Sequence, residues 1–109
     1  MADNSHSRPA EQCKTMDDVR KEIDRVDTAL VELLAERWSY VDRIWHLKSS
    51  PEEATVPWRI EQVIDRVKAK AETHNAPPEL AETVWRHMIQ WGIDYEEKKL
   101  RERDQKTKT

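Results

Sequence analysis

Two basic residues, Arg37 and Lys48, lie eleven positions apart in a segment with the apolar pattern of a helix. Eleven residues of α-helix turn through roughly 1100°, so the two side chains point within ~20° of each other, about 16 Å apart along the axis. Arg37 occupies one of the apolar positions, where a guanidinium is costly unless an anion or hydrogen-bond acceptors meet it. Two long cationic side chains on one face can hold the two ends of a small dianion. The spacing therefore predicts a site for a small dianion.

Each basic residue, taken alone, also has a simpler interpretation. Arg37 can form a structural salt bridge with a carboxylate, and Lys48 can complement the dipole at a helix C-terminus. Arg20 lies seventeen positions before Arg37 and can pair with Asp17 or Asp24 at the surface. Seventeen helical residues place Arg20 ~25 Å from Arg37 and about 100° round the axis. One helix cannot bring both arginines to a single ligand, whereas an antiparallel neighbouring helix can.

The element that carries these residues is a long amphipathic helix. Its apolar face recurs in steps of four and three, which is the spacing of one helical face: Val19, Ile23, Val26, Leu30, Leu33, Tyr40, Ile44 and Leu47, with Arg37 among them. Thr15 is suited to be the N-cap, because its hydroxyl can accept a hydrogen bond from a free backbone N–H of the first turn. Asp17 and Asp18, which follow in that turn, suit the positive end of the helix dipole. We expect this helix from about Met16 to Lys48, a length that indicates an extended bundle or a core shared between subunits.

Proline-containing segments predict two further helices. The run Ser50-Pro51-Glu52-Glu53 should end the first helix, and Pro57 suits the first turn of a second, which should continue to about His74. A third should start at Pro77 or Pro78 and continue to about Arg101. The sequence thus predicts an all-α fold of three helices, one long and two shorter, with a flexible arm at 1–15, a helical domain at 16–103 and a frayed tail at 104–109.

The composition limits the classes of function. A chain of 109 residues is one domain, and a core built from it alone would be thin, so burial between subunits is expected. The net charge of −3 disfavours a nucleic-acid-binding protein. One cysteine, Cys13, excludes an internal disulfide framework and suits a reducing compartment. No segment has the apolar length of a membrane span and no secretory signal is present, which predicts a cytoplasmic protein. The histidines lack the spacing of a metal site.

The third helix should turn a carboxylate inward. Trp85, Ile89, Gly92 and Glu96 follow one another at steps of four, three and four, so Glu96 shares an inward-facing row with apolar residues. Gly92 costs ~1 kcal/mol against alanine inside a helix, and is best tolerated where another backbone or a ligand comes close. Alternatively, Glu96 is an exposed member of the charged run Glu96-Glu97-Lys98.

Taken together, these residues resemble the all-α chorismate mutase family of the small bacterial type. The segment from Val19 to Asp27, VRKEIDRVD, is similar to the motif that opens the family's first helix, and LLAER, from Leu33 to Arg37, is similar to its next motif. Lys48 lies at the spacing of the family's lysine. The resemblance covers about Met16 to Glu97.

The resemblance implies an intertwined homodimer of three-helix subunits that binds a small-molecule dicarboxylate, converts chorismate to prephenate and needs no cofactor. It places Arg37 and Lys48 on the carboxylate and the ether oxygen of the substrate, and Arg20 in the site of the partner subunit. Arg59 matches a further pocket arginine. Glu96 stands where many members have glutamine, and it must be protonated to donate a hydrogen bond to the ether oxygen. Burial should then raise its pKa.

Two positions depart from the family pattern. Ile60 replaces the carboxylate that binds the ring hydroxyl, with Glu61 one position late, and Gly92 replaces a small polar or aromatic residue. The related isochorismate pyruvate lyases share the scaffold and also lack that carboxylate, and Tyr40-Val41 and Trp91 resemble them. The alternatives to a mutase are therefore a lyase that forms salicylate and pyruvate from isochorismate, and a non-catalytic helical interaction or regulatory module.

Overall fold

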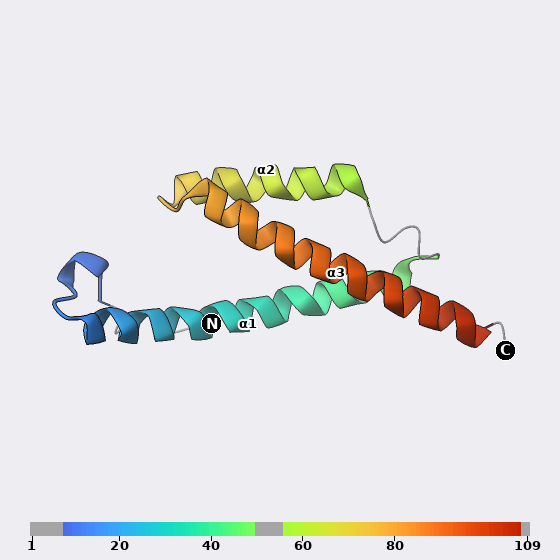
Figure 1. Cartoon of the computed structure of the whole chain (residues 1–109), viewed down its shortest axis with the longest axis horizontal. Helices are drawn as coiled ribbons and strands as arrows, with labels where there is room; N and C mark the ends of the chain where they lie inside the picture. Colours follow the sequence, from blue (N-terminus) through green and yellow to red (C-terminus); the bar gives the residue numbers. More distant parts are fainter. Residues whose placement is uncertain (1–7, 50–55, 108–109) are drawn as a thin grey trace. The chain divides into compact units, whose positions relative to one another are not determined.

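The structure, a computed structural model, describes residues 8–49 and 56–107. Within these ranges the chain forms a short 3₁₀ helix, η1 (Ala10–Gln12), and three α-helices, α1 (Met16–Leu47), α2 (Pro57–Thr73) and α3 (Pro78–Thr107), and contains no strand (Figure 1). The all-α prediction with three helices is confirmed. The chain divides into two compact units, one ending at Tyr40 and one beginning at Val41, and each is described by itself.

The start of α1 is fixed by the predicted cap. The Thr15 hydroxyl accepts a hydrogen bond from the backbone N–H of Asp18 at 3.1 Å, and the Asp18 carboxylate accepts one from the backbone N–H of Lys14 at 2.9 Å. These two bonds satisfy N–H groups that have no partner within the helix. The helix ends at Leu47, one residue before the expected end. The break predicted at Ser50-Pro51 lies outside the described residues.

Within the arm predicted for residues 1–15, the part from Arg8 onward contacts the first turns of α1; residues 1–7 are not described. The Arg8 guanidinium pairs with Asp18 at 2.9 Å, and its backbone N–H donates to Glu22 at 3.0 Å. The hydrogen bond from Arg8 is the main cause of the lowered pKa of the Glu22 carboxyl. Because the arm carries no apolar period, these polar contacts with the first turns of α1 could not be predicted from the sequence.

A tight connection joins α2 and α3. Pro57 is the first residue of α2 and Pro78 the first of α3, as predicted. Between the helices Asn75 has a φ of 60°, the left-handed conformation that asparagine tolerates better than most residues. Backbone N–H groups of Asn75 and Ala76 donate to the carbonyls of Glu72 and Ala71 at 3.2 and 2.8 Å. These are the two bonds of a Schellman motif, which closes the end of α2.

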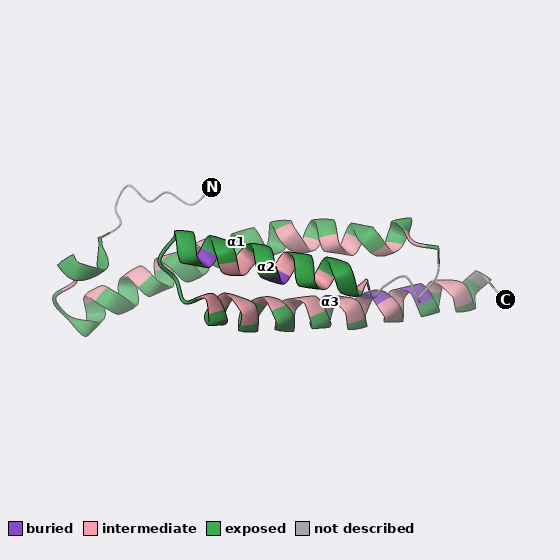
Figure 2. Ribbon diagram, turned by 90° about the horizontal axis from the view of Figure 1, so that it is seen from above, coloured by how far each residue is buried: buried purple, intermediate pink, exposed green. Residues whose placement is uncertain are grey.

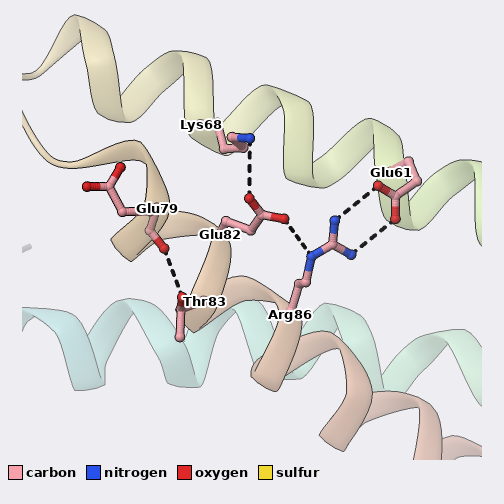
Figure 3. A network of polar contacts seen from close by, with 6 residues as sticks. All are labelled: Glu61, Lys68, Glu79, Glu82, Thr83 and Arg86. Atoms are coloured by element: carbon pink, nitrogen blue, oxygen red, sulfur yellow. Dashed lines mark hydrogen bonds and ion pairs between the residues drawn. The ribbon is translucent and has the colours of Figure 1, made fainter.

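The helices α2 and α3 lie side by side (Figures 1 and 2), and α2 buries Ile64 and Ala71. A polar network also joins them (Figure 3). The Arg86 guanidinium on α3 contacts both carboxylate oxygens of Glu61 on α2 at 3.1 Å and Glu82 at 2.8 Å, and Glu82 pairs with Lys68 at 3.2 Å. Hydrogen bonds from Arg86 are the main cause of the lowered pKa values of the Glu61 and Glu82 carboxyls. The paired, bidentate geometry fixes the register of the two helices.

The third helix is longer than predicted. It continues to Thr107 rather than ending near Arg101, so the tail expected to fray from residue 104 is helical up to that point, and 108–109 lie outside the described residues. Pairs one turn apart, such as Lys99 with Glu102 at 3.7 Å, support this polar end. The extension lengthens the face of α3 that meets the end of α1.

Most of the apolar face of α1 is exposed in this chain. The exposed large apolar residues of α1 are Met16, Val19, Ile23, Val26, Leu30, Val31, Leu33, Leu34, Tyr40, Ile44 and Leu47. Elsewhere in the described ranges, the fully or largely buried apolar side chains are Ile64, Ala71 and Leu100. No helix in these ranges is long and apolar enough to cross a bilayer. The exposed face of α1 therefore has the character of a surface that another protein surface covers.

Candidate active site

The end of α1 and the middle of α3 bring an ammonium and a carboxyl together. Nζ of Lys48, the residue that follows α1, lies 3.5 Å from each of the two carboxyl oxygens of Glu96 on α3. A charge-assisted hydrogen bond between fully ionised partners is usually shorter, about 2.7–2.9 Å. The pair is therefore in contact without the geometry of a tight ion pair.

Glu96 is buried, as its place in the inward-facing row predicted. Its exposed fraction is 7%, which excludes the alternative of an exposed member of the run Glu96-Glu97-Lys98. Among the described residues, no group donates a hydrogen bond to its buried oxygen Oε1. Burial raises the pKa of Glu96 above its usual value, and Glu97 raises it further, while Lys48 opposes the rise. The carboxyl thus tends toward the neutral form that can donate a hydrogen bond.

Gly92 lies one turn before Glu96 on the same row, and it is also buried. A Cβ at this position would meet Cγ1 of Val41 on α1 at 3.5 Å, an ordinary van der Waals distance. Among the described residues the near neighbour is thus a side chain and not another backbone, and the alternative of a ligand stays a prediction. Within the same part of the chain, no neighbour of that Cβ requires glycine at this position.

The second helix supplies the remaining candidates of this unit. Arg59 is exposed and donates a hydrogen bond to Gln62 on its own helix. Ile60 is half-buried and lines a hollow of about 290 Å³, with Glu61 and Arg86 among its other residues. Glu61, the carboxylate one position late, is held by Arg86 on both oxygens (Figure 3). In the structure, Arg59 thus contacts its own helix and Glu61 contacts α3.

Two predicted site residues belong to the unit that ends at Tyr40. Arg20 is exposed on α1, and its guanidinium lies 4.0 Å from Asp17 one turn earlier. Arg37 is half-buried within the apolar face of α1. Arg20 thus has the exposure that contact with a partner subunit would require, and its surface pairing with Asp17 is long and weak.

The sequence reasoning missed one residue beside the pair. Arg103 on α3 donates hydrogen bonds to backbone carbonyls at the end of α1, including that of Lys48 at 2.9 Å. It lies seven positions after Glu96, two turns along the same face. This seven-residue spacing was visible in the sequence. The residues around Arg103 are polar and show no apolar period, however, so nothing indicated that this face of the helix meets another element.

The pair of Lys48 and Glu96 can stabilise negative charge that develops on an oxygen. A lysine ammonium supplies a compact positive charge, and a neutral carboxyl supplies an O–H donor. Donors fixed before the reaction in a site that excludes water stabilise such a charge more strongly than water does. The arrangement fits a reaction that needs charge stabilisation rather than covalent catalysis.

Comparison with known proteins agrees with this geometry. Residues 19–97 match the chorismate mutase type II family, and the chain therefore belongs to that family. The chain is also 28% identical over 83 residues to an isochorismate pyruvate lyase of Pseudomonas aeruginosa, an alignment that covers 76% of this chain and 82% of that protein. The family is enzymatic, and the two activities named in these comparisons act on related substrates. The match ends at residue 97, before the extension of α3 that carries Arg103.

Proposed function

We propose that this protein is a chorismate mutase that rearranges chorismate to prephenate. The observation that carries the proposal is the buried carboxyl of Glu96 beside the ammonium of Lys48, in a chain of the chorismate mutase type II family. The reaction is intramolecular: the C–O bond to the ether oxygen breaks while a C–C bond forms, and no proton is transferred. Catalysis then depends on holding the compact conformer and on stabilising charge at the ether oxygen.

In this mechanism the cationic residues have separate roles. Arg37 would bind one substrate carboxylate through the two parallel hydrogen bonds of a guanidinium. Arg20 would reach the site from the partner subunit. Lys48 and protonated Glu96 would both donate to the ether oxygen.

Isochorismate pyruvate lyase is the second candidate, and two observations favour it. One is the similarity to the lyase of Pseudomonas aeruginosa. The other is the absence of a carboxylate at Ile60, together with the engagement of Glu61 by Arg86, which leaves no obvious acceptor for the ring hydroxyl of chorismate on this part of α2. Elimination of pyruvate also breaks a C–O bond at the ether oxygen, so the Lys48–Glu96 pair suits either reaction.

The deciding experiment incubates the purified protein with chorismate and, separately, with isochorismate. We expect loss of chorismate absorbance with formation of prephenate. Salicylate fluorescence and pyruvate from isochorismate, at a higher kcat/KM, would instead assign the lyase. Absence of turnover of both substrates at micromolar enzyme would contradict both assignments and favour a non-catalytic helical module.

We further propose that a second copy of the chain covers the apolar face of α1, as the family resemblance implies. Fully burying one leucine stabilises by about 1.5–3 kcal/mol, and α1 exposes many such side chains. The variant Leu30→Glu would place a carboxylate in that interface. We expect wild-type protein to sediment as a dimer and Leu30→Glu to be monomeric or unfolded, as judged by analytical ultracentrifugation and circular dichroism. Thr28→Glu, about 200° round the helix, is the matched control and should remain dimeric; a monomeric wild type would contradict the proposal.

A further inference from the structure

The end of α1 is held by a side chain from α3. The last carbonyls of an α-helix have no partner within the helix, and they carry its partial negative charge. Arg103 donates from Nη1 to the carbonyls of Lys48 at 2.9 Å and Trp45 at 3.4 Å, and from Nη2 to that of Ser49 at 3.2 Å. The carboxylate of Asp104 lies 3.6 Å from Nη2 and forms an ion pair with the guanidinium. One planar side chain thus contacts three backbone carbonyls, those of Trp45, Lys48 and Ser49, around the point where α1 ends.

The same face of α3 contacts both the backbone and the side chain of Lys48. Glu96 and Arg103 are seven residues apart, so they lie within ~20° of each other on the helix. Between them Leu100 has an exposed fraction of 0%, which anchors this stretch of α3 in the protein. Glu96 faces Nζ of Lys48, while Arg103 holds its carbonyl. Lys48 is therefore held at its backbone by Arg103 and at its ammonium by Glu96.

We propose that Arg103 is a positioning residue of the active site: by binding backbone carbonyls at and just after the end of α1, it fixes the backbone of Lys48 and keeps the ammonium against Glu96. The proposal builds on the proposed function, because Lys48 is the group that would contact the substrate. Lysine has four rotatable side-chain bonds and follows the last helical residue, so without an external restraint its ammonium would sample many positions. A displacement of about 1 Å at a reacting centre can cost ~10²-fold in rate. A helix cap with a purely structural role would leave the rate unaffected in protein that remains folded.

The test compares Arg103→Ala with Arg101→Ala in the full chain. Arg101 is an exposed arginine of the same helix, about 200° from Arg103. We expect Arg103→Ala to lower kcat for the favoured substrate by at least tenfold with a smaller change in KM, because Lys48 would act mainly in the transition state. Arg101→Ala should stay within about twofold of wild type. Arg103→Lys keeps the charge but not the planar fork, and should fall between the two.

A second measurement does not depend on turnover. Trace acetylation of the native proteins with acetic anhydride, followed by peptide mass spectrometry, reports the accessibility of each lysine amine. The side chain of Lys48 has an exposed fraction of 19%. We expect its labelling to rise several-fold in Arg103→Ala and to stay at the wild-type level in Arg101→Ala. The exposed Lys98 provides an internal reference.

The outcomes separate this proposal from the proposed function. If kcat and Lys48 labelling in folded Arg103→Ala equal those of Arg101→Ala, the positioning role is wrong. If Arg103→Ala loses its helical circular dichroism, Arg103→Lys decides: increased Lys48 labelling supports the role, and wild-type labelling overturns it. If wild-type protein converts neither substrate, the proposed function fails, while the labelling comparison still tests how Lys48 is held.

Discussion

Replacing Lys48 by alanine should lower kcat for the rearrangement by about 10²–10³-fold, the loss that follows removal of one preorganised donor to a developing negative charge. KM should change less, because the ether oxygen gains most of its charge after binding. The truncation also leaves Glu96 without the ammonium that opposes its raised pKa. Steady-state kinetics on chorismate and isochorismate measure the effect for both candidate reactions.

The control for this variant is Lys98→Ala, which removes an exposed lysine from α3, two residues after Glu96. It should retain wild-type kinetics, and circular dichroism should show both variants folded. Lys48→Ala with a kcat equal to that of Lys98→Ala would remove Lys48 from the mechanism. It would also leave the buried carboxyl as the only donor of the proposed pair.

The second large effect is a dependence of rate on pH that Glu96 controls. Burial raises the pKa of this carboxyl, so it keeps its proton to higher pH than an ordinary glutamic acid, whose reference pKa is 4.5. The protonated form is the donor, so kcat should be constant below the raised pKa and fall about tenfold per pH unit above it. Glu96→Gln keeps a donor that cannot ionise, and its profile should stay flat over the same range.

Glu97→Gln is the matched control for that experiment. It removes the neighbouring charge that raises the pKa of Glu96, so the fall in rate should begin at a lower pH and keep its slope. Three profiles, recorded from pH 4 to 9 with protein shown to stay folded, distinguish the possibilities. A profile of Glu96→Gln that coincides with wild type would show that the protonation of another group limits the rate.

Local patterns in the sequence predicted the helices well, because each depends on neighbours in the chain. Thr15 caps α1 because its hydroxyl accepts a hydrogen bond from a free backbone N–H. Pro57 begins α2 and Pro78 begins α3, positions where the N–H that proline lacks would have no partner within the helix. The end of α3 was missed because the residues after Arg101 are polar on all sides and carry no apolar period. The structure of the arm was missed because it depends on the contacts of Arg8 with Asp18 and Glu22.

For the site, periodicity predicted which face Glu96 occupies but not which residue it meets. Its burial is confirmed, and its contact with Lys48, 48 positions away in the sequence, is visible only in three dimensions. The contacts of Arg103 are harder to predict, since backbone carbonyls are present in every residue and leave no trace in sequence. The catalytic roles of Arg20, Arg37, Arg59 and Gly92 stay predictions for kinetics to test.

The uncovered apolar face of α1 has a consequence for how the protein acquires its structure. If a second copy covers that face, as we propose, much of the hydrophobic free energy of folding arises only when two chains meet. Folding would then be coupled to association and would follow mass action, so that dilution alone would deplete the native species. A newly synthesised chain would remain incompletely packed and prone to aggregation until it bound a second copy.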